Sequence, residues 1–223
     1  KAANLGDSTA QNNVGRNYQF GEGTAQNNIK AHEYYAKGAL QNHDGAMVNL
    51  GLFYSKGIVV EKDYAKALEL YKKAAAMGNM AGAYNLGNAY VNGENVEKDL
   101  GEALHFYKLA ADRGYVESNC RIGKIYREKN EIEMAIRYFS IGADKGLSAC
   151  EWQLGFTYEN SLNDPAQAIQ WYEVAASRNN RDAYHSLGLI YDFGKGVKQN
   201  YTKAFKYYQL GESIISIDEE TKK

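Results

Sequence analysis

The apolar residues of this chain form short stripes with helical spacing. Ala46, Leu50, Gly51 and Tyr54 fall on one side of a helix at the spacing i, i+4, i+5 and i+8. A second stripe runs through residues 67–75 at the spacing i, i+1, i+4, i+7 and i+8. The pattern therefore predicts two amphipathic helices joined by a short polar loop.

The same pair of stripes occurs six times. Each first stripe contains a glycine that follows Leu, Ile or Val and precedes a tyrosine by three residues. These unit glycines are Gly15, Gly51, Gly87, Gly123, Gly155 and Gly188, and they lie 36, 36, 36, 32 and 33 residues apart. A period between about 20 and 50 residues is typical of stacked repeats, and the helical stripes predict an all-α chain.

Small and aromatic residues recur at fixed places in each unit and predict how the helices pack. A small residue stands five before each unit glycine, and the second helix contributes an alanine and, four residues later, an aromatic ring. The turn after each second helix carries glycine or asparagine, which tolerate positive φ. These turn residues are Gly6, Asn42, Gly78, Gly114, Gly146 and Asn179. Asp63 is the predicted N-cap of the second helix of the second unit.

The spacing between units varies in one place only. From the second-helix alanine to the next unit glycine is always 20 residues, as from Ala31 to Gly51. From the unit glycine to the alanine of the same unit the distance is 16, 16, 16, 12, 13 and 16 residues. We therefore expect constant stacking between units and a variable loop within each unit.

The combined pattern resembles the Sel-1-like repeat, a relative of the tetratricopeptide repeat. Residues 46–78 and 183–211 carry it most fully, whereas units four and five have Lys129 and Ser161 in place of the loop glycine. The resemblance implies a right-handed α/α superhelix, a solenoid of about six helix-turn-helix repeats, forming a single domain over residues 1–212. The expected units are 8–43, 44–79, 80–115, 116–147, 148–180 and 181–215, with 1–7 as the remnant of a preceding unit and 216–223 as a polar tail.

Composition argues against several classes of function. The formal net charge is −1, so no overall basic charge attracts nucleic acid, and no apolar run is long enough for a transmembrane helix. His32, His43, His105 and His185 fall in different units, without cysteine or carboxylate partners at ligand spacing that would complete a site. No phosphate-binding loop or nucleophile motif is present, so we expect neither metal nor cofactor.

The two cysteines, Cys120 and Cys150, fall in the first helices of adjacent units. Neighbouring helices pack about 8–10 Å apart, and a disulfide needs Cα atoms within about 7 Å. Because the two positions are also out of phase, we expect two unpaired, buried or half-buried thiols. That expectation favours a reducing, cytoplasmic compartment, while a signal segment upstream of Lys1 stays open.

The first helices also predict a binding surface. In the resembled families, the first helix of each pair lines the concave side of the superhelix, which serves as an extended binding groove. Positions −3, +1, +4 and +5 from the unit glycine are left free by the packing. The predicted partner-binding residues at these positions are Tyr84, Asn88, Lys124, Arg127, Trp152, Phe156, His185 and Leu189. Rings would anchor a peptide and the cations would bind a carboxylate or backbone carbonyls; alternatively, Trp152 and Phe156 pack against the neighbouring unit.

These features predict a non-enzymatic adaptor that binds a protein or peptide partner, as a monomer or a weak end-to-end dimer. The resemblance places such proteins in assembly, signalling and quality control. A second hypothesis is a structural spacer inside a larger protein. A third is a hydrolase using paired carboxylates, for which Glu128 and Glu159 are the available pair.

Overall fold

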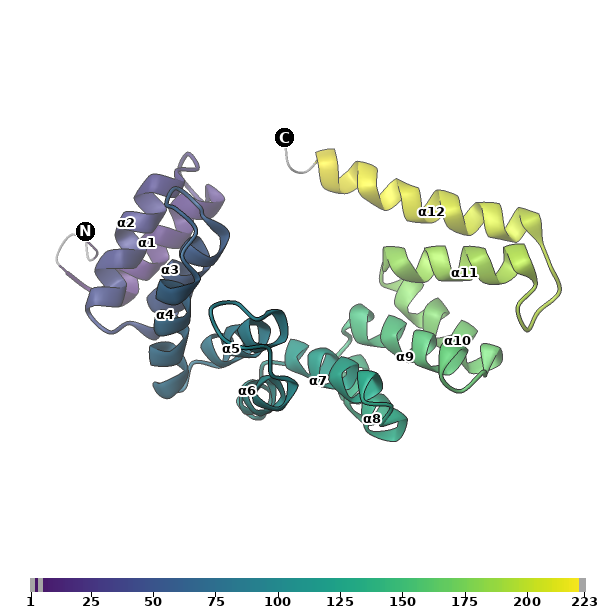
Figure 1. Ribbon diagram of the computed structural model, residues 1–223. Coiled ribbons are helices and arrows are strands. Elements are labelled where there is room, and N and C mark those ends of the chain that lie inside the picture. Colours follow the sequence, from purple (N-terminus) through teal and green to yellow (C-terminus); the bar gives the residue numbers. More distant parts are fainter. Residues whose placement is uncertain (1–2, 4–5, 221–223) are drawn as a thin grey trace. The chain divides into compact units, whose positions relative to one another are not determined.

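The computed structural model describes residues 3 and 6–220, and this part of the chain contains twelve α-helices and no strand (Figure 1). Consecutive helices pack as pairs, which confirms the predicted all-α fold of six helix-turn-helix units. The helices are α1 (Ser8–Phe20), α2 (Asn28–Leu40), α3 (Asp44–Lys56), α4 (Tyr64–Ala76), α5 (Met80–Asn92), α6 (Leu100–Asp112), α7 (Glu117–Glu128), α8 (Ile132–Asp144), α9 (Ser148–Asn160), α10 (Pro165–Ser177), α11 (Arg181–Phe193) and α12 (Tyr201–Glu220).

The helices gather into two compact halves, Lys1–Ser118 and Asn119–Lys223. The N-terminal half holds α1 to α6, and the C-terminal half holds most of α7 and all of α8 to α12. Each half has its own buried core. One core in the N-terminal half centres on Phe53 and Tyr35, and the core around α10 and α11 in the C-terminal half centres on Tyr172 and Leu187.

The close approach of glycine and aromatic ring holds the two helices of each pair together. A Cβ placed on Gly87 would lie 2.6 Å from the ring of Tyr107, and one on Gly155 would lie 2.5 Å from the ring of Tyr172. Both rings are buried. Real side chains do not approach this closely, so the unit glycine creates the space that the aromatic ring fills.

The turns between units have the predicted backbone conformation. All six turn residues have positive φ: 92° at Gly6, 59° at Asn42, 96° at Gly78, 94° at Gly114, 78° at Gly146 and 58° at Asn179. Asp63 caps α4 as predicted, because its Oδ1 accepts the backbone amide of Lys66 at 2.9 Å. Turn and cap chemistry thus determine where the second helices end and begin.

The loop inside each unit closes on the carbonyl of the repeated tyrosine. In the first unit the backbone amide of Asn27 donates to Tyr18 O at 2.7 Å, nine residues earlier; in the fourth, Glu131 donates to Tyr126 O at 2.8 Å, only five residues earlier. The remaining closures join Asp63 to Tyr54, Asp99 to Tyr90, Asp164 to Tyr158 and Asn200 to Tyr191. Loop length therefore varies while the closing hydrogen bond is retained.

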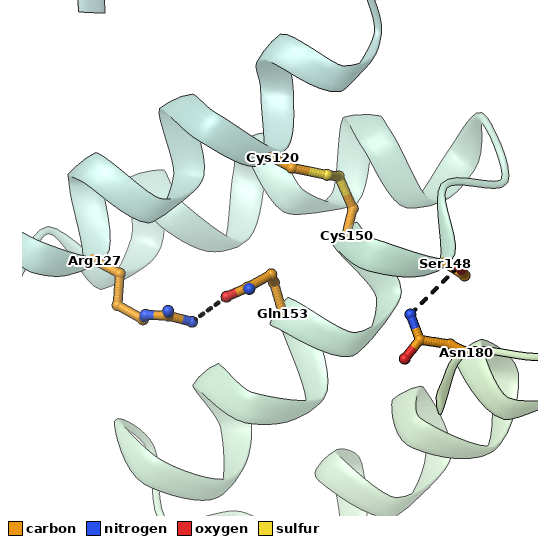
Figure 2. Close-up of a disulfide and its surroundings, with 6 residues drawn as sticks. All are labelled: Cys120, Arg127, Ser148, Cys150, Gln153 and Asn180. Carbon is orange, nitrogen blue, oxygen red and sulfur yellow. Dashed lines mark hydrogen bonds between the residues drawn. A yellow bond between two sulfur atoms is a disulfide. The ribbon is translucent and has the colours of Figure 1, made fainter. Parts of the chain in front are cut away.

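The expectation of two unpaired thiols is wrong, because Cys120 and Cys150 form a disulfide with their Cα atoms 5.3 Å apart (Figure 2). Gly142 on α8 explains the close approach. A Cβ on Gly142 would collide with the Sγ of Cys150 and lie 3.5 Å from that of Cys120. The missing side chain lets α7 and α9 come closer at this point than average helix spacing suggests, and the argument for a reducing compartment loses its basis.

The expected terminal segments lie partly outside the described residues. Within residues 1–7, Ala3 is buried and its carbonyl accepts a hydrogen bond from the Gln11 side chain at 3.3 Å. At the other end, α12 continues to Glu220 and so includes much of the expected tail. The extra length of α12 distinguishes it from the other second helices, which have 13 residues each.

Candidate partner-binding surface

The predicted binding residues lie on four first helices, and none of their side chains is fully buried. Tyr84 and Asn88 lie on α5 in the N-terminal half. The other six belong to the C-terminal half: Lys124 and Arg127 on α7, Trp152 and Phe156 on α9, and His185 and Leu189 on α11. Two other positions expected to be free, Val48 and Cys120, are buried, at 5% and 8% exposure.

In the N-terminal half, Tyr84 and Asn88 take part in packing within their own unit. The Tyr84 ring lies 5.5 Å from that of Tyr107 and 4.7 Å from that of Tyr115. The Tyr107 hydroxyl donates to Asn88 Oδ1 at 2.7 Å. Both residues keep part of their surface exposed, but their polar and aromatic groups already have partners.

Arg127 is the centre of the surface in the C-terminal half. Its Nη1 donates to Gln153 Oε1 at 2.7 Å (Figure 2). The same nitrogen donates to Thr157 Oγ1 at 3.4 Å. The guanidinium also lies 4.7 Å above the ring of Phe156. Burial lowers the pKa of Arg127, although nearby Glu128 opposes this. These described contacts of the guanidinium are all with uncharged groups, so its charge is not neutralised by a carboxylate at ion-pair distance.

Lys124 lies one turn before Arg127 and is also half-buried. Burial lowers the pKa of Lys124, and repulsion by Arg121 and Arg127 lowers it further, while Asp182 and Glu128 oppose the effect. The Lys124 ammonium forms no ion pair with a described carboxylate. The two side chains thus place two partly desolvated cations on one face of α7.

Trp152 and Phe156 provide the aromatic part of the surface. Their ring centroids are 5.5 Å apart at an interplanar angle of 41°, and Trp152 Nε1 donates to Ser186 Oγ at 3.1 Å. Both rings also pack against the core around Tyr172 on α10. Trp152 therefore contacts the neighbouring unit through Ser186, as the alternative expected, and both Trp152 and Phe156 remain partly exposed.

Glu159, one carboxylate of the hypothetical hydrolase pair, already has two partners. Tyr172 Oη donates to Glu159 Oε2 at 2.8 Å, and Lys195 Nζ lies 3.0 Å from Oε1. Burial, followed by the charge of Glu159, raises the pKa of Tyr172. Glu128, the other carboxylate of the hypothetical hydrolase pair, is exposed. Glu159 is thus held by partners that suit a structural role.

A profile of the Sel1 repeat matches six segments of the chain, residues 8–43, 45–79, 81–115, 121–147, 148–180 and 181–211. The chain belongs to the Sel1 repeat family. This agrees with the resemblance seen in the sequence. Proteins built from Sel1 repeats are generally non-enzymatic modules for protein interaction.

Known Sel1 repeat proteins and their relatives match this chain over different lengths. The crystal structure of a Sel1 repeat protein from Oxalobacter formigenes has a TM-score of 0.82 and 29% identity, covering 94% of this chain and 89% of that one. The rat protein DAP3-binding cell death enhancer 1 is 33% identical over 86 residues, which are 38% of this chain and 17% of the relative. The chitin synthase regulator SKT5 of Saccharomyces cerevisiae (strain ATCC 204508 / S288c) is 29% identical over 98 residues, 40% of this chain and 14% of the relative. The chain spans about a sixth of the length of these curated relatives.

The Sel1 repeat register also shows which residues of the surface the sequence analysis missed. Gln153, Thr157 and Ser186 complete the polar contacts of Arg127 and Trp152. Thr157 carries a recognisable signal, because four of the other five units have apolar residues such as Phe53 and Ile190 at the same position. Gln153 and Ser186 lie at position −2, which we did not count among the free positions.

Two further features, a metal-binding group and a membrane-spanning helix, are not found in the part of this Sel1 repeat chain that the structure describes. Within residues 3 and 6–220, no group of three or more His, Cys, Asp or Glu side chains is arranged to hold a metal ion. Over the same residues, no helix combines the length and the apolar character needed to cross a membrane.

Proposed function

We propose that this Sel1 repeat protein is a non-enzymatic adaptor that binds an acidic peptide segment of a partner protein on the first helices of its C-terminal half. The binding surface consists of Lys124, Arg127, Trp152, Phe156, His185 and Leu189. The observation that carries the proposal is the pair of half-buried cations, Lys124 and Arg127, which lie beside the Trp152–Phe156 rings and form no ion pair with a carboxylate of the described residues.

The chemistry of the peptide follows from these contacts. A carboxylate near Lys124 and Arg127 would restore the electrostatic stabilisation that burial has removed from both cations. A partner side chain would pack against the exposed side of Trp152 and Phe156, as aromatic anchors do in protein interfaces. Tyr84 and Asn88 stay predicted binding residues of the N-terminal half, although their present contacts make them weaker candidates.

The names of the relatives support an adaptor role. One relative is described as binding DAP3 and the other as a regulator of chitin synthase, so both names refer to action on another protein. The relatives are several times longer than the matched segment. A spacer within a larger protein is therefore the second candidate. If the chain is a spacer, the affinity of peptides selected on the intact chain should not change when Lys124 and Arg127 are substituted.

The test begins with peptides selected from a random library on the wild-type protein. We expect the selected peptides to be rich in Asp and Glu and to lose at least tenfold in affinity for a Lys124→Glu/Arg127→Glu variant. The matched control is Lys145→Glu/Lys206→Glu, which makes the same change in net charge at exposed positions. The control should leave affinity unchanged, and circular dichroism should show that both variants stay folded.

Because Arg127 also contacts Gln153, Lys124→Glu alone and Arg127→Lys are needed as milder variants. Affinity should fall for Lys124→Glu and should weaken with rising ionic strength. Selected peptides that lack acidic residues, or that bind all these variants equally, would exclude this surface as the binding site.

A further inference from the structure

Within each half of the molecule, a first helix docks on the preceding second helix through two small residues. A Cβ on Gly38 of α2 would lie 2.8 Å from the Cβ of Ala46 on α3, and one on Gly82 of α5 would lie 3.0 Å from the Cβ of Ala74 on α4. Ala46 and Gly82 are each the third residue of their helix. The same position is occupied by Cys150 in α9 and Ala183 in α11. The docking face of a second helix therefore accepts the N-terminal turn of another helix with a small third residue.

On α12 the corresponding face is uncovered. Phe205 is 61% exposed, whereas Leu68 and Leu104 at the same position of earlier units are 6% and 8% exposed. Tyr208 is partly exposed, although its counterparts on the other second helices are buried. Glu212 is exposed where Ala75 and four other alanines are buried or half-buried. This face therefore has the apolar residues of a docking surface, Phe205 and Tyr208, and a carboxylate, Glu212, at its edge.

A hollow of about 600 Å³ lies on this face. Its walls include Asp182 and His185 of α11 and Phe205, Tyr208, Gly211 and Glu212 of α12. Gly211 stands at the small position equivalent to Gly38 and Ala74. A Cβ on Gly211 would meet the Tyr184 Cβ at 3.4 Å and the Arg181 carbonyl at 3.8 Å, both on α11, and no other described atom within 4 Å, whereas a Cβ on Gly38 meets Ala46 of the next first helix.

The backbone of α12 does not turn where the other second helices do. Their left-handed glycine or asparagine stands eleven residues after the second-helix alanine, but Ile215 occupies that position after Ala204. The helix instead runs on to Glu220, and Figure 1 shows α12 extending past the end of α11. The left-handed turn that ends each earlier second helix is therefore not made at this position of α12.

We propose that this face of α11 and α12 binds an α-helix of a partner protein, in place of a following first helix. The bound helix would carry a small residue at its third position, over Gly211, and a leucine or isoleucine four residues later, as α3, α5, α9 and α11 do. Glu212 would lie beside the N-terminal turn of the bound helix, where a carboxylate favours the positive end of the helix dipole. The site shares His185 with the proposed peptide-binding surface but includes neither Lys124 nor Arg127, so variants at those two residues and at Phe205 test the two proposals separately.

A partner helix fits better than the first helix of a second copy. In this chain the equivalent side of α1 is occupied, because Gln11 is buried and its side chain bonds to the carbonyl of Ala3. A second copy would have to break this contact before its α1 could dock. A partner helix whose N-terminal turn is free would dock without first breaking such a contact.

The probe is a fluorescent, helix-stapled peptide with the sequence of residues 79–92, the N-cap and helix α5 that dock on α4 within the chain. Stapling is needed because a free helix of this length is marginal in water. We expect saturable binding to the full chain that weakens at least tenfold in Phe205→Glu. The matched control Phe193→Glu alters a phenylalanine that is 67% exposed and outside the hollow, and should bind as the wild type does.

A second protein variant, Gly211→Met, should also weaken binding because it fills the hollow. A probe carrying Gly82→Glu should fail to bind the wild-type chain. Absence of saturable binding, or equal binding to wild type and Phe205→Glu, would overturn the proposal. A concentration-dependent dimer in sedimentation that Phe205→Glu abolishes would overturn it in favour of a second copy as the occupant.

Discussion

Residues in this protein pack in pairs, in which a small residue leaves a space and a larger residue fills it. The unit glycine removes a side chain from the first helix, and an aromatic ring of the second helix occupies the space. Gly142 serves the disulfide in the same way, because its missing side chain accommodates Cys150. Glycine lowers helix stability elsewhere by about 0.5–1 kcal/mol relative to alanine, so its presence in the middle of six helices reflects packing.

The sign of the change in stability on glycine-to-alanine substitution tests this pairing. Gly155→Ala should lower the free energy of unfolding by about 1–3 kcal/mol, because the new methyl group collides with the Tyr172 ring. Gly211→Ala is the control, since its Cβ meets Tyr184 at an ordinary 3.4 Å, and it should raise stability slightly. Urea unfolding of both variants gives the comparison. Stabilisation by Gly155→Ala would show that the ring can move aside freely.

At the scale of elements, first helices in the C-terminal half are connected to each other by side chains as well as by packing. The disulfide and the Arg127–Gln153 hydrogen bond both join α7 to α9 (Figure 2). Between α9 and α11, Trp152 donates to Ser186, and Asn180 at the start of α11 donates to Ser148 at 3.4 Å. These links hold the proposed binding surface in one arrangement.

Removing the disulfide should therefore weaken the C-terminal half. The bridge spans 30 residues, and cross-links of that length stabilise folded proteins by about 3–4 kcal/mol through the unfolded chain. A Cys120→Ser/Cys150→Ser variant should unfold at lower denaturant concentration, and thiol titration of the unfolded wild type should detect no free cysteine. Two reactive thiols in the untreated protein would contradict the bridge.

The sequence predicted the elements well because each is specified by local chemistry. Helix stripes, the cap at Asp63 and the left-handed turn residues all depend on neighbours in the chain. The disulfide was missed because average helix spacing does not include the local approach that Gly142 permits. Gln153 and Thr157 were missed because their role depends on Arg127, which reaches them from another helix. Local signals therefore predict the repeat, and contacts between helices complete the site.

At the scale of the whole molecule, each half has a core of its own. The core around Phe53 draws on α2, α3 and α4, whereas the core around Tyr172 draws on α10 and α11. In repeat proteins, each unit is stabilised chiefly by its neighbours. The two compact halves should consequently respond separately to a local loss of packing.

Hydrogen exchange followed by mass spectrometry can measure this separation. Phe53→Ala removes a fully buried ring, at a cost of about 3–5 kcal/mol. Amide exchange should rise in α2 to α4 and stay unchanged in α10 and α11. Phe139→Ala, which also removes a fully buried ring but lies on α8 against Gly123 of α7 in the C-terminal half, should raise exchange in α7 and α8 and leave α2 to α4 unchanged. Equal acceleration in both halves would show that the protein opens as one cooperative unit.

The hydrogen bond from each loop to its tyrosine carbonyl makes the protein suited to carrying inserted sequence. The closure spans five residues at Tyr126 and nine at Tyr18 without altering the helix pair that it joins. Doubling the length of a flexible loop costs only about 0.6 kcal/mol in closure entropy. An epitope or receptor-binding peptide placed between Gly93 and Asp99 would thus be displayed on a rigid helical support, and natural variants could diversify these loops while their stacking surfaces stay the same.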